Sequence, residues 1–143
     1  IPKGLVGSEM CIRDSAMGAT AFQKGLGAIH AMSHPVGAVF NTHHGTTNAV
    51  CMPAVLAFNA DTIRGRFDQA AAYLGIDGGF DGFCEFVQQF NDSFAIPRTL
   101  TEMGVSEDRL DDLVALALED PSCGGNPVEL TADGLRGLFR ACF

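Results

Sequence analysis

The sequence is poor in positive charge, and nearly all of its aromatic residues are phenylalanine. It has 9 lysines and arginines against 17 aspartates and glutamates, a formal net charge of −8, with no tryptophan and one tyrosine. Such an excess of negative charge repels a phosphate backbone and an anionic membrane surface. We therefore expect no nucleic-acid partner and no charge-driven binding to membranes.

The sequence also lacks a long apolar run. The longest, from Ala49 to Phe58, has ten residues and contains Pro53, whereas a membrane-spanning helix needs about 20. The sequence does not begin with the basic segment and apolar stretch that are typical of a signal peptide. We expect no membrane segment.

Paired cysteine motifs are missing as well. The five cysteines are odd in number, widely scattered and never arranged as CxxC. This pattern is typical of reduced thiols in a protein core rather than of a disulfide framework. We therefore expect a cytoplasmic protein.

What the sequence does have is apolar residues at three- and four-residue spacing, which is typical of amphipathic helices. A chain of 143 residues with 47% hydrophobic content is long enough for one domain. We predict an all-α fold, a helical bundle with no strand. The predicted helices are Ala16–Ser33, Gly45–Phe58, Asp61–Tyr73, Gly79–Phe94, one capped by Ser106 that stops before Pro121, and one capped by Thr131.

Prolines and polar residues predict where the first two helices end. Pro35 disfavours helical geometry in the residue before it, so the first helix should end near Ser33 and a loop should follow as far as His44. Pro53 should kink the second helix or divide it into two pieces, and Asn59 should end it.

Phenylalanines form a stripe on the predicted helix from Gly79 to Phe94. The residues at three- and four-residue steps are Phe80, Phe83, Val87, Phe90 and Phe94. We interpret this stripe as core packing. A helical domain made to dock against another would nevertheless expose a large apolar patch, so we expect the isolated chain to be poorly soluble.

All four histidines, His30, His34, His43 and His44, fall within fifteen residues. His30 and His34 would share one helix face if the helix extends that far, and His44 lies next to the predicted helix start at Gly45. Neutral imidazole binds zinc and ferrous iron, and a catalytic metal site takes about three protein ligands and keeps one position open. The spacing allows convergence on one ion, and it is equally compatible with two capping or core histidines.

A resemblance to the iron-containing (group III) alcohol dehydrogenases lies in the segment from Gly25 to Asn59, GLGAIHAMSHPVGAVFNTHHGTTNAVCMPAVLAFN. It joins a Gly- and Ala-rich helix, an HxxxHP element, a loop, and an HG followed by an Asn-Ala helix that leads to a Pro and a final Phe-Asn. The segments IPRTLTEMGV (Ile96 to Val105) and DPSCGGNPVELT (Asp120 to Thr131) are similar to later parts of the family. The resemblance therefore covers roughly Ala16 to Phe143.

The resemblance implies that the chain is the metal-binding C-terminal domain of such an enzyme. His30 and His44 would bind Fe²⁺ or, alternatively, Zn²⁺. His34 would lie beside the nicotinamide of NAD or NADP and the substrate oxygen, where it would position the substrate or relay its proton. The metal would act as a Lewis acid on the alcohol oxygen while the nicotinamide takes the hydride. His43 stands where many members have proline, and we give it no catalytic role.

Two family features have no counterpart in the sequence. Members bind the metal through four protein ligands, and neither the second pair, an aspartate and a histidine four residues apart, nor a GxGxxG motif is present. The resemblance therefore implies a missing N-terminal nucleotide-binding domain, weak metal affinity and an inactive isolated fragment. The segment from Ile1 to Ser15 looks like translated adapter or vector sequence, and we hypothesise that it is not native and that residues 16–143 form the domain.

Two other interpretations stay open. One alternative is an inactive fragment or a free-standing helical module that binds a metal or a partner. Glycerol dehydrogenases, maleylacetate reductases and dehydroquinate synthases share related architectures with a different chemistry, although the segments HAMSHP and HHGTTNAV favour the alcohol dehydrogenase branch. The primary alcohol or aldehyde, NAD against NADP, iron against zinc, and the formation of a homo-oligomer are left undecided.

Overall fold

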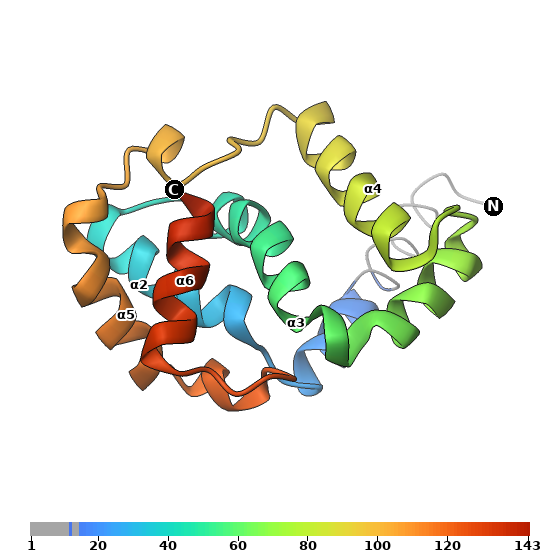
Figure 1. The fold of residues 1–143 in the computed structure, drawn as a ribbon, viewed down its shortest axis with the longest axis horizontal. Coiled ribbons are helices and arrows are strands. Elements are labelled where there is room, and N and C mark those ends of the chain that lie inside the picture. Colours follow the sequence, from blue (N-terminus) through green and yellow to red (C-terminus); the bar gives the residue numbers. More distant parts are fainter. Residues whose placement is uncertain (1–11, 13–14) are drawn as a thin grey trace.

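A computed structural model describes the chain at residue 12 and at residues 15–143, and these residues form helices joined by short loops (Figure 1). No strand occurs among them, which confirms the all-α prediction. The hypothesis about Ile1 to Ser15 falls almost entirely outside the described residues. Residues 15–23 are helical, and the further elements are α2 (Ala28–Phe40), α3 (His44–Leu74), α4 (Gly79–Ser93), α5 (Leu110–Glu119) and α6 (Ala132–Cys142), with 3₁₀ turns at Thr101–Met103, Glu107–Arg109 and Pro121–Gly125.

The main core lies where α2, the first half of α3, α5 and α6 meet (Figure 1). On α5 and α6 the side chains that face this core include Leu113 and Phe139, which are fully buried. Because α2 packs against both α3 and α5, its side chains are held from two sides. The buried members of the main core are Ala28, Met32, Val36, Val50, Cys51, Val55, Leu100, Val105, Leu110, Leu113, Val114, Ala117, Leu135, Leu138, Phe139 and Cys142.

The predicted capping residues are at the helix ends. The Ser106 side chain accepts from the backbone N–H of Asp108, and the Thr131 side chain accepts from that of Gly134. Each satisfies one of the N–H groups that the first turn of a helix leaves without an intrahelical partner. Gly75 ends α3 in the left-handed region at φ 71°, which favours glycine.

The second half of α3 and α4 form a hairpin of two long helices beside the main core (Figure 1). Its core is small, with Leu56, Ile63, Phe80 and Val87 as the buried members. The prediction that the whole aromatic stripe packs inside is wrong for its last members, because the side chains of Phe90 and Phe94 are 53% and 66% exposed. Among the described residues α4 packs mainly against α3, which leaves its outer face uncovered.

The first predicted helix is in fact two. Residues 15–23 are helical, the chain turns at residues 24–27, and α2 begins at Ala28. Gly25 adopts a φ of 91°, a conformation that side chains disfavour. The helix break therefore lies at the glycines of the GLG segment.

The predictions of a helix end near Ser33 and of a loop from Pro35 to His44 are wrong, because α2 continues through Pro35 to Phe40. A proline inside a helix costs about 3 kcal/mol. Met32 and Val36 are fully buried, and burying one such side chain contributes about 1.5–3 kcal/mol. Packing against the main core offsets the local cost of the proline.

The predicted division at Pro53 and the predicted helix end at Asn59 are wrong, since α3 is one helix of 31 residues. The alternative of a kink at Pro53 stays a prediction. Pro53 has no N–H to donate to the carbonyl of Ala49, one turn earlier. The side-chain amide of Asn91 on α4 donates to that carbonyl instead, at 3.1 Å. A residue far along the chain thus replaces the missing helical hydrogen bond.

Candidate functional site

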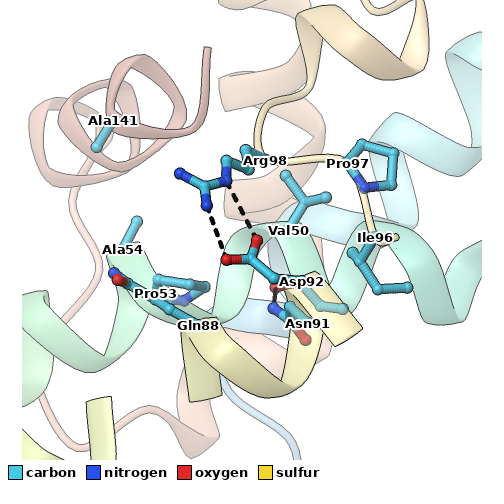
Figure 2. A pocket seen from close by; sticks show the side chains of 11 residues that line it. Val50, Pro53, Ala54, Gln88, Asn91, Asp92, Ile96, Pro97, Arg98 and Ala141 are labelled. Carbon is cyan, nitrogen blue, oxygen red and sulfur yellow. Dashed lines mark hydrogen bonds and ion pairs between the residues drawn. The ribbon is translucent and has the colours of Figure 1, made fainter. Parts of the chain in front are cut away.

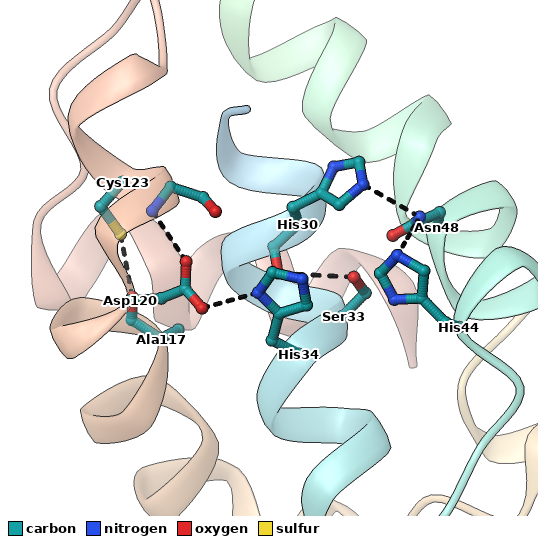
Figure 3. A network of polar contacts seen from close by, with 9 residues as sticks. His30, Ser33, His34, His44, Asn48, Ala117, Asp120 and Cys123 are labelled. Carbon is teal, nitrogen blue, oxygen red and sulfur yellow. Dashed lines mark hydrogen bonds and ion pairs between the residues drawn. The ribbon is translucent and has the colours of Figure 1, made fainter. Parts of the chain in front are cut away.

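Three of the four histidines form a compact cluster on the surface of the main core (Figure 3). His30 and His34 lie one turn apart on α2, and His44 is the first residue of α3. Their ring centroids are 5.2 Å (His30 to His44), 5.4 Å (His34 to His44) and 5.7 Å (His30 to His34) apart. Because α2 extends past Pro35, the connection from α2 to α3 is only three residues, and it brings His44 back beside the two histidines of α2.

The ring nitrogens of His30 and His44 point toward the same place. The side-chain nitrogen of Asn48 lies 3.4 Å from Nε2 of His30 and 3.1 Å from Nε2 of His44 (Figure 3). The amide oxygen of Asn48 is buried and has no hydrogen-bond partner among the described residues. Two imidazole nitrogens that converge on one point provide two of the protein ligands of a ferrous iron or zinc site.

His34 has a different environment, because a carboxylate holds its ring. Nδ1 of His34 lies 2.7 Å from Oδ2 of Asp120, which follows α5 (Figure 3). The other carboxylate oxygen, Oδ1, accepts from the backbone N–H of Ser122 at 2.8 Å. Asp120 therefore joins the histidine cluster to the Pro121–Gly125 turn. Asp120 was not among the predicted site residues, although an aspartate that precedes a proline is a recognisable signal of a cap for the next turn.

Two groups of the cluster have shifted pKa values. Burial, followed by the charges of His44 and His34, lowers the pKa of His30 below its usual value. Burial by itself would raise the pKa of Asp120, but the hydrogen bonds from Ser122 and His34 outweigh it, and the net pKa is lowered. The arrangement thus favours a neutral His30 and an ionised Asp120.

His43 has a structural role. It is the N-cap of α3, and its Nδ1 accepts from the backbone N–H of Thr46 at 3.3 Å. One of the four histidines is therefore a capping residue, which was one of the two interpretations of their spacing. The absence of a catalytic role for His43 stays a prediction.

Within the described part of the chain, no group of three or more His, Cys, Asp and Glu side chains is arranged to hold a metal ion. His30 and His44 converge, while Nδ1 of His34 is occupied by Asp120. The residues present fit two of the roughly three ligands that a catalytic metal takes.

The same residues 12 and 15–143 also contain no helix of the length and apolar character needed to span a membrane.

An apolar hollow of about 490 Å³ opens beside His30. Its walls come from the 15–23 helix, the GLG turn, α2 and α3, and they include Phe22, Ile29, Leu56 and Phe67. A hollow of this composition suits the hydrocarbon part of a small organic molecule.

A second hollow, of about 260 Å³, lies between α3, α4 and the segment that follows α4 (Figure 2). Arg98 pairs with Asp92 across it, at 2.7 Å, over a wall that includes Pro53 (Figure 2). The side chain of Arg98 is 75% exposed and that of Asp92 is 45% exposed. No histidine lines this hollow, so it is separate from the cluster.

The GGNP segment supports the start of α2. Oδ1 of Asn126 accepts from the backbone N–H of Ala28 and from the side chain of Asn59, and its amide nitrogen donates to Asn59 Oδ1 and to the carbonyl of Val128. The Asn126 side chain therefore ties the start of α2 to α3. Because it caps α2, Asn126 also fixes the helix that presents His30.

Comparison with known proteins identifies the class to which this site belongs. The C-terminal model of the Fe-containing alcohol dehydrogenase family matches residues 6–143. The chain therefore belongs to the iron-containing alcohol dehydrogenase family and corresponds to its C-terminal part, as the resemblance implied. The match begins ten residues before Ala16, and the non-native origin of Ile1 to Ser15 stays a prediction.

Particular relatives agree with the family match. The chain is 40% identical over 134 residues to 4-hydroxybutyrate dehydrogenase of Cupriavidus necator, covering 87% of this chain and 35% of that protein. It is 31% identical over 144 residues to lactaldehyde reductase of Escherichia coli (strain K12), covering 96% and 38%. The crystal structure of a 1,3-propanediol oxidoreductase superimposes with a TM-score of 0.77 at 27% identity, covering 82% and 33%. The chain spans about a third of the length of these relatives.

Proposed function

We propose that the chain is the metal-binding part of an NAD- or NADP-dependent alcohol dehydrogenase, which transfers a hydride between a primary alcohol or its aldehyde and the nicotinamide. The observation that carries the proposal is the convergence of His30 and His44 on one point with His34 beside them. Membership of the family and the dehydrogenase and reductase chemistry named for the relatives support it.

His30 and His44 would hold the metal, with Fe²⁺ favoured by the family and Zn²⁺ as the alternative. When bound, the metal supplies Lewis-acid polarisation of the substrate oxygen. The lowered pKa of His30 keeps its imidazole neutral, and only the neutral imidazole is a metal ligand. The remaining ligands and the nucleotide-binding domain would come from a longer protein, and the isolated chain would be inactive.

His34 would act on the proton of the alcohol. Its Nδ1 is occupied by Asp120, which leaves Nε2 as the nitrogen that can accept or return a proton. The ring lies next to His30 and His44, so a substrate oxygen near those two nitrogens would be close to His34. In this role His34 would also lie beside the nicotinamide of the bound cofactor.

The apolar hollow beside His30 would take the carbon chain of the substrate and exclude water from the reacting atoms.

We propose a cytoplasmic location. The thiols that the structure describes are free, which suits this location; they are Cys51, Cys84, Cys123 and Cys142. We propose no nucleic-acid partner, and the surface exposed on the α3–α4 hairpin is available for a neighbouring domain or a second subunit.

Metal content and turnover of the full-length protein test the proposal together. We expect His30→Ala and His44→Ala to lose the metal, measured by elemental analysis of the purified protein. We expect His34→Ala to keep the metal and to lower kcat by about 10²–10⁴-fold, because it removes a proton relay. His43→Ala is the matched control and should retain both. Equal loss of metal in the His30, His34 and His44 variants would refute the separate role of His34.

A further inference from the structure

Asp120 and His34 meet although 86 residues separate them in the sequence. The contact of 2.7 Å joins the middle of α2 to the residue that follows α5. Asp120 is well held in place, because its side chain is only 12% exposed and its second oxygen accepts from the backbone N–H of Ser122. The two oxygens of one carboxylate therefore have separate partners.

The chemistry of the two groups decides which nitrogen of His34 carries the proton. A neutral imidazole has one N–H donor and one bare nitrogen acceptor, whereas an ionised carboxylate can only accept. The short contact therefore requires the proton on Nδ1. Nε2 is then the bare nitrogen, and it has no hydrogen-bond partner among the residues that the structure describes.

We infer that Asp120 is a positioning residue, which holds the His34 ring in the Nδ1–H form so that Nε2 is presented as a proton acceptor. The assignment of the tautomer depends on the geometry alone. The use of Nε2 to accept the alcohol proton rests on the proposed function. A carboxylate that orients an imidazole in this way selects its tautomer and stabilises the charged ring that forms when it takes a proton.

The substitution Asp120→Asn should reverse the tautomer preference of His34 while it keeps the size and shape of the side chain at position 120. The amide oxygen can take the place of Oδ1 and still accept from the Ser122 N–H. The NH₂ group then stands where Oδ2 stood, and it can only donate to Nδ1 of His34. The ring should move its proton to Nε2. Asp120→Glu keeps a carboxylate that can accept from Nδ1 of His34, so the ring should keep the Nδ1–H form in part.

The direct test is ¹⁵N NMR of the His34 ring in the full 143-residue chain without metal, at a pH about two units above the usual histidine pKa of about 6.5. We expect the protonated nitrogen to be Nδ1 in the original chain and in Asp120→Glu, and Nε2 in Asp120→Asn. Asp68→Asn is the matched control, because Oδ1 of Asp68 also accepts a backbone N–H, that of Phe80, at 2.7 Å. A proton on Nε2 in the original chain, or the same tautomer in the original chain and Asp120→Asn, would overturn the inference.

The second test is steady-state kinetics of the full-length protein. We expect Asp120→Asn to lower kcat by about 10–100-fold at unchanged metal content, with a small change in KM and partial recovery in Asp120→Glu. If the original enzyme is active and kcat is unchanged in Asp120→Asn, the positioning role of Asp120 is refuted and the proposed function stands. A switched tautomer in a protein that never oxidises an alcohol would refute the proposed function alone.

Discussion

The main core and the α3–α4 hairpin use the same kind of helix, yet they differ in how much they bury. The main core surrounds α2 with α3 and α5 and buries sixteen apolar side chains. The hairpin buries four and leaves Phe86, Phe90 and Phe94 between 43% and 66% exposed. All three clustered histidines lie on helices of the main core, which shows that the candidate site is built on the better-packed region.

The exposed face of the hairpin also bears on contacts with another domain or subunit. The chain spans little more than a third of its relatives' length, and a row of exposed phenylalanines is a surface that another domain or subunit can cover. The histidine cluster does not depend on that surface for its shape, because its partners are Asn48 and Asp120. We therefore expect the geometry of the cluster to be more robust than the solubility of the chain.

The largest effect should come from a cavity in the main core. Phe139 is fully buried, so Phe139→Ala should lower the free energy of unfolding by about 3–5 kcal/mol. Phe90, which is 53% exposed on the hairpin, is the matched control, and Phe90→Ala should cost less than about 1 kcal/mol. Urea denaturation followed by circular dichroism measures both. Equal losses in the two variants would contradict the contrast between the two regions.

A smaller loss is expected when the polar link between α2 and α3 is cut. Asn126→Ala removes the cap of Ala28 and leaves the buried side chain of Asn59 without its partner, which should cost about 2–3 kcal/mol. Asn59→Ala and the double variant complete a cycle, in which we expect a coupling of about 1 kcal/mol. Gln89→Ala, on an exposed face of α4, should have almost no effect. Strictly additive losses would show that the two amides do not depend on each other.

Neighbouring glycines in the GGNP turn give a sharper comparison. A Cβ on Gly125 would lie 1.9 Å from the carbonyl oxygen of Leu26, whereas a Cβ on Gly124 would meet nothing within 4 Å. Gly125→Ala must therefore displace the backbone before α2, at a cost of about 1–3 kcal/mol. Gly124→Ala should change the stability little in the same thermal or urea unfolding measurement. If both variants behave alike, the close approach of the turn to α2 is wrong.

The sequence predicted the elements whose causes are local. The caps at Ser106 and Thr131 depend on residues within one turn of the helix end. The candidate histidines were found for a similar reason, because their spacing and the surrounding signature are contiguous in the sequence. His30, His34 and His44 do meet in the structure, while their roles as ligands and proton relay stay predictions.

The features that could not be predicted depend on contacts between distant residues. Pro53 indicated a break because its missing hydrogen bond is visible in the sequence, whereas its replacement by Asn91, 42 residues from Ala49, is not. Asp120 was missed because nothing near it in the sequence points to His34. In both cases a tertiary contact reverses or completes a local rule.

The smallest effect concerns Asp120 and acid. Its pKa is lower in the folded chain than the usual 3.8, so the ionised group stabilises the fold above about pH 4, and this contribution is lost as the pH falls through the folded pKa. The loss of unfolding free energy in Asp120→Asn should be about 1 kcal/mol near pH 5 and should shrink toward pH 3. Asp111→Asn, with a side chain 85% exposed, should show a smaller dependence because solvent screens its ion pair. If the difference in unfolding free energy between the original chain and Asp120→Asn instead stays constant from about pH 5 to pH 3, the carboxylate of Asp120 is not stabilised by His34 and Ser122 on folding.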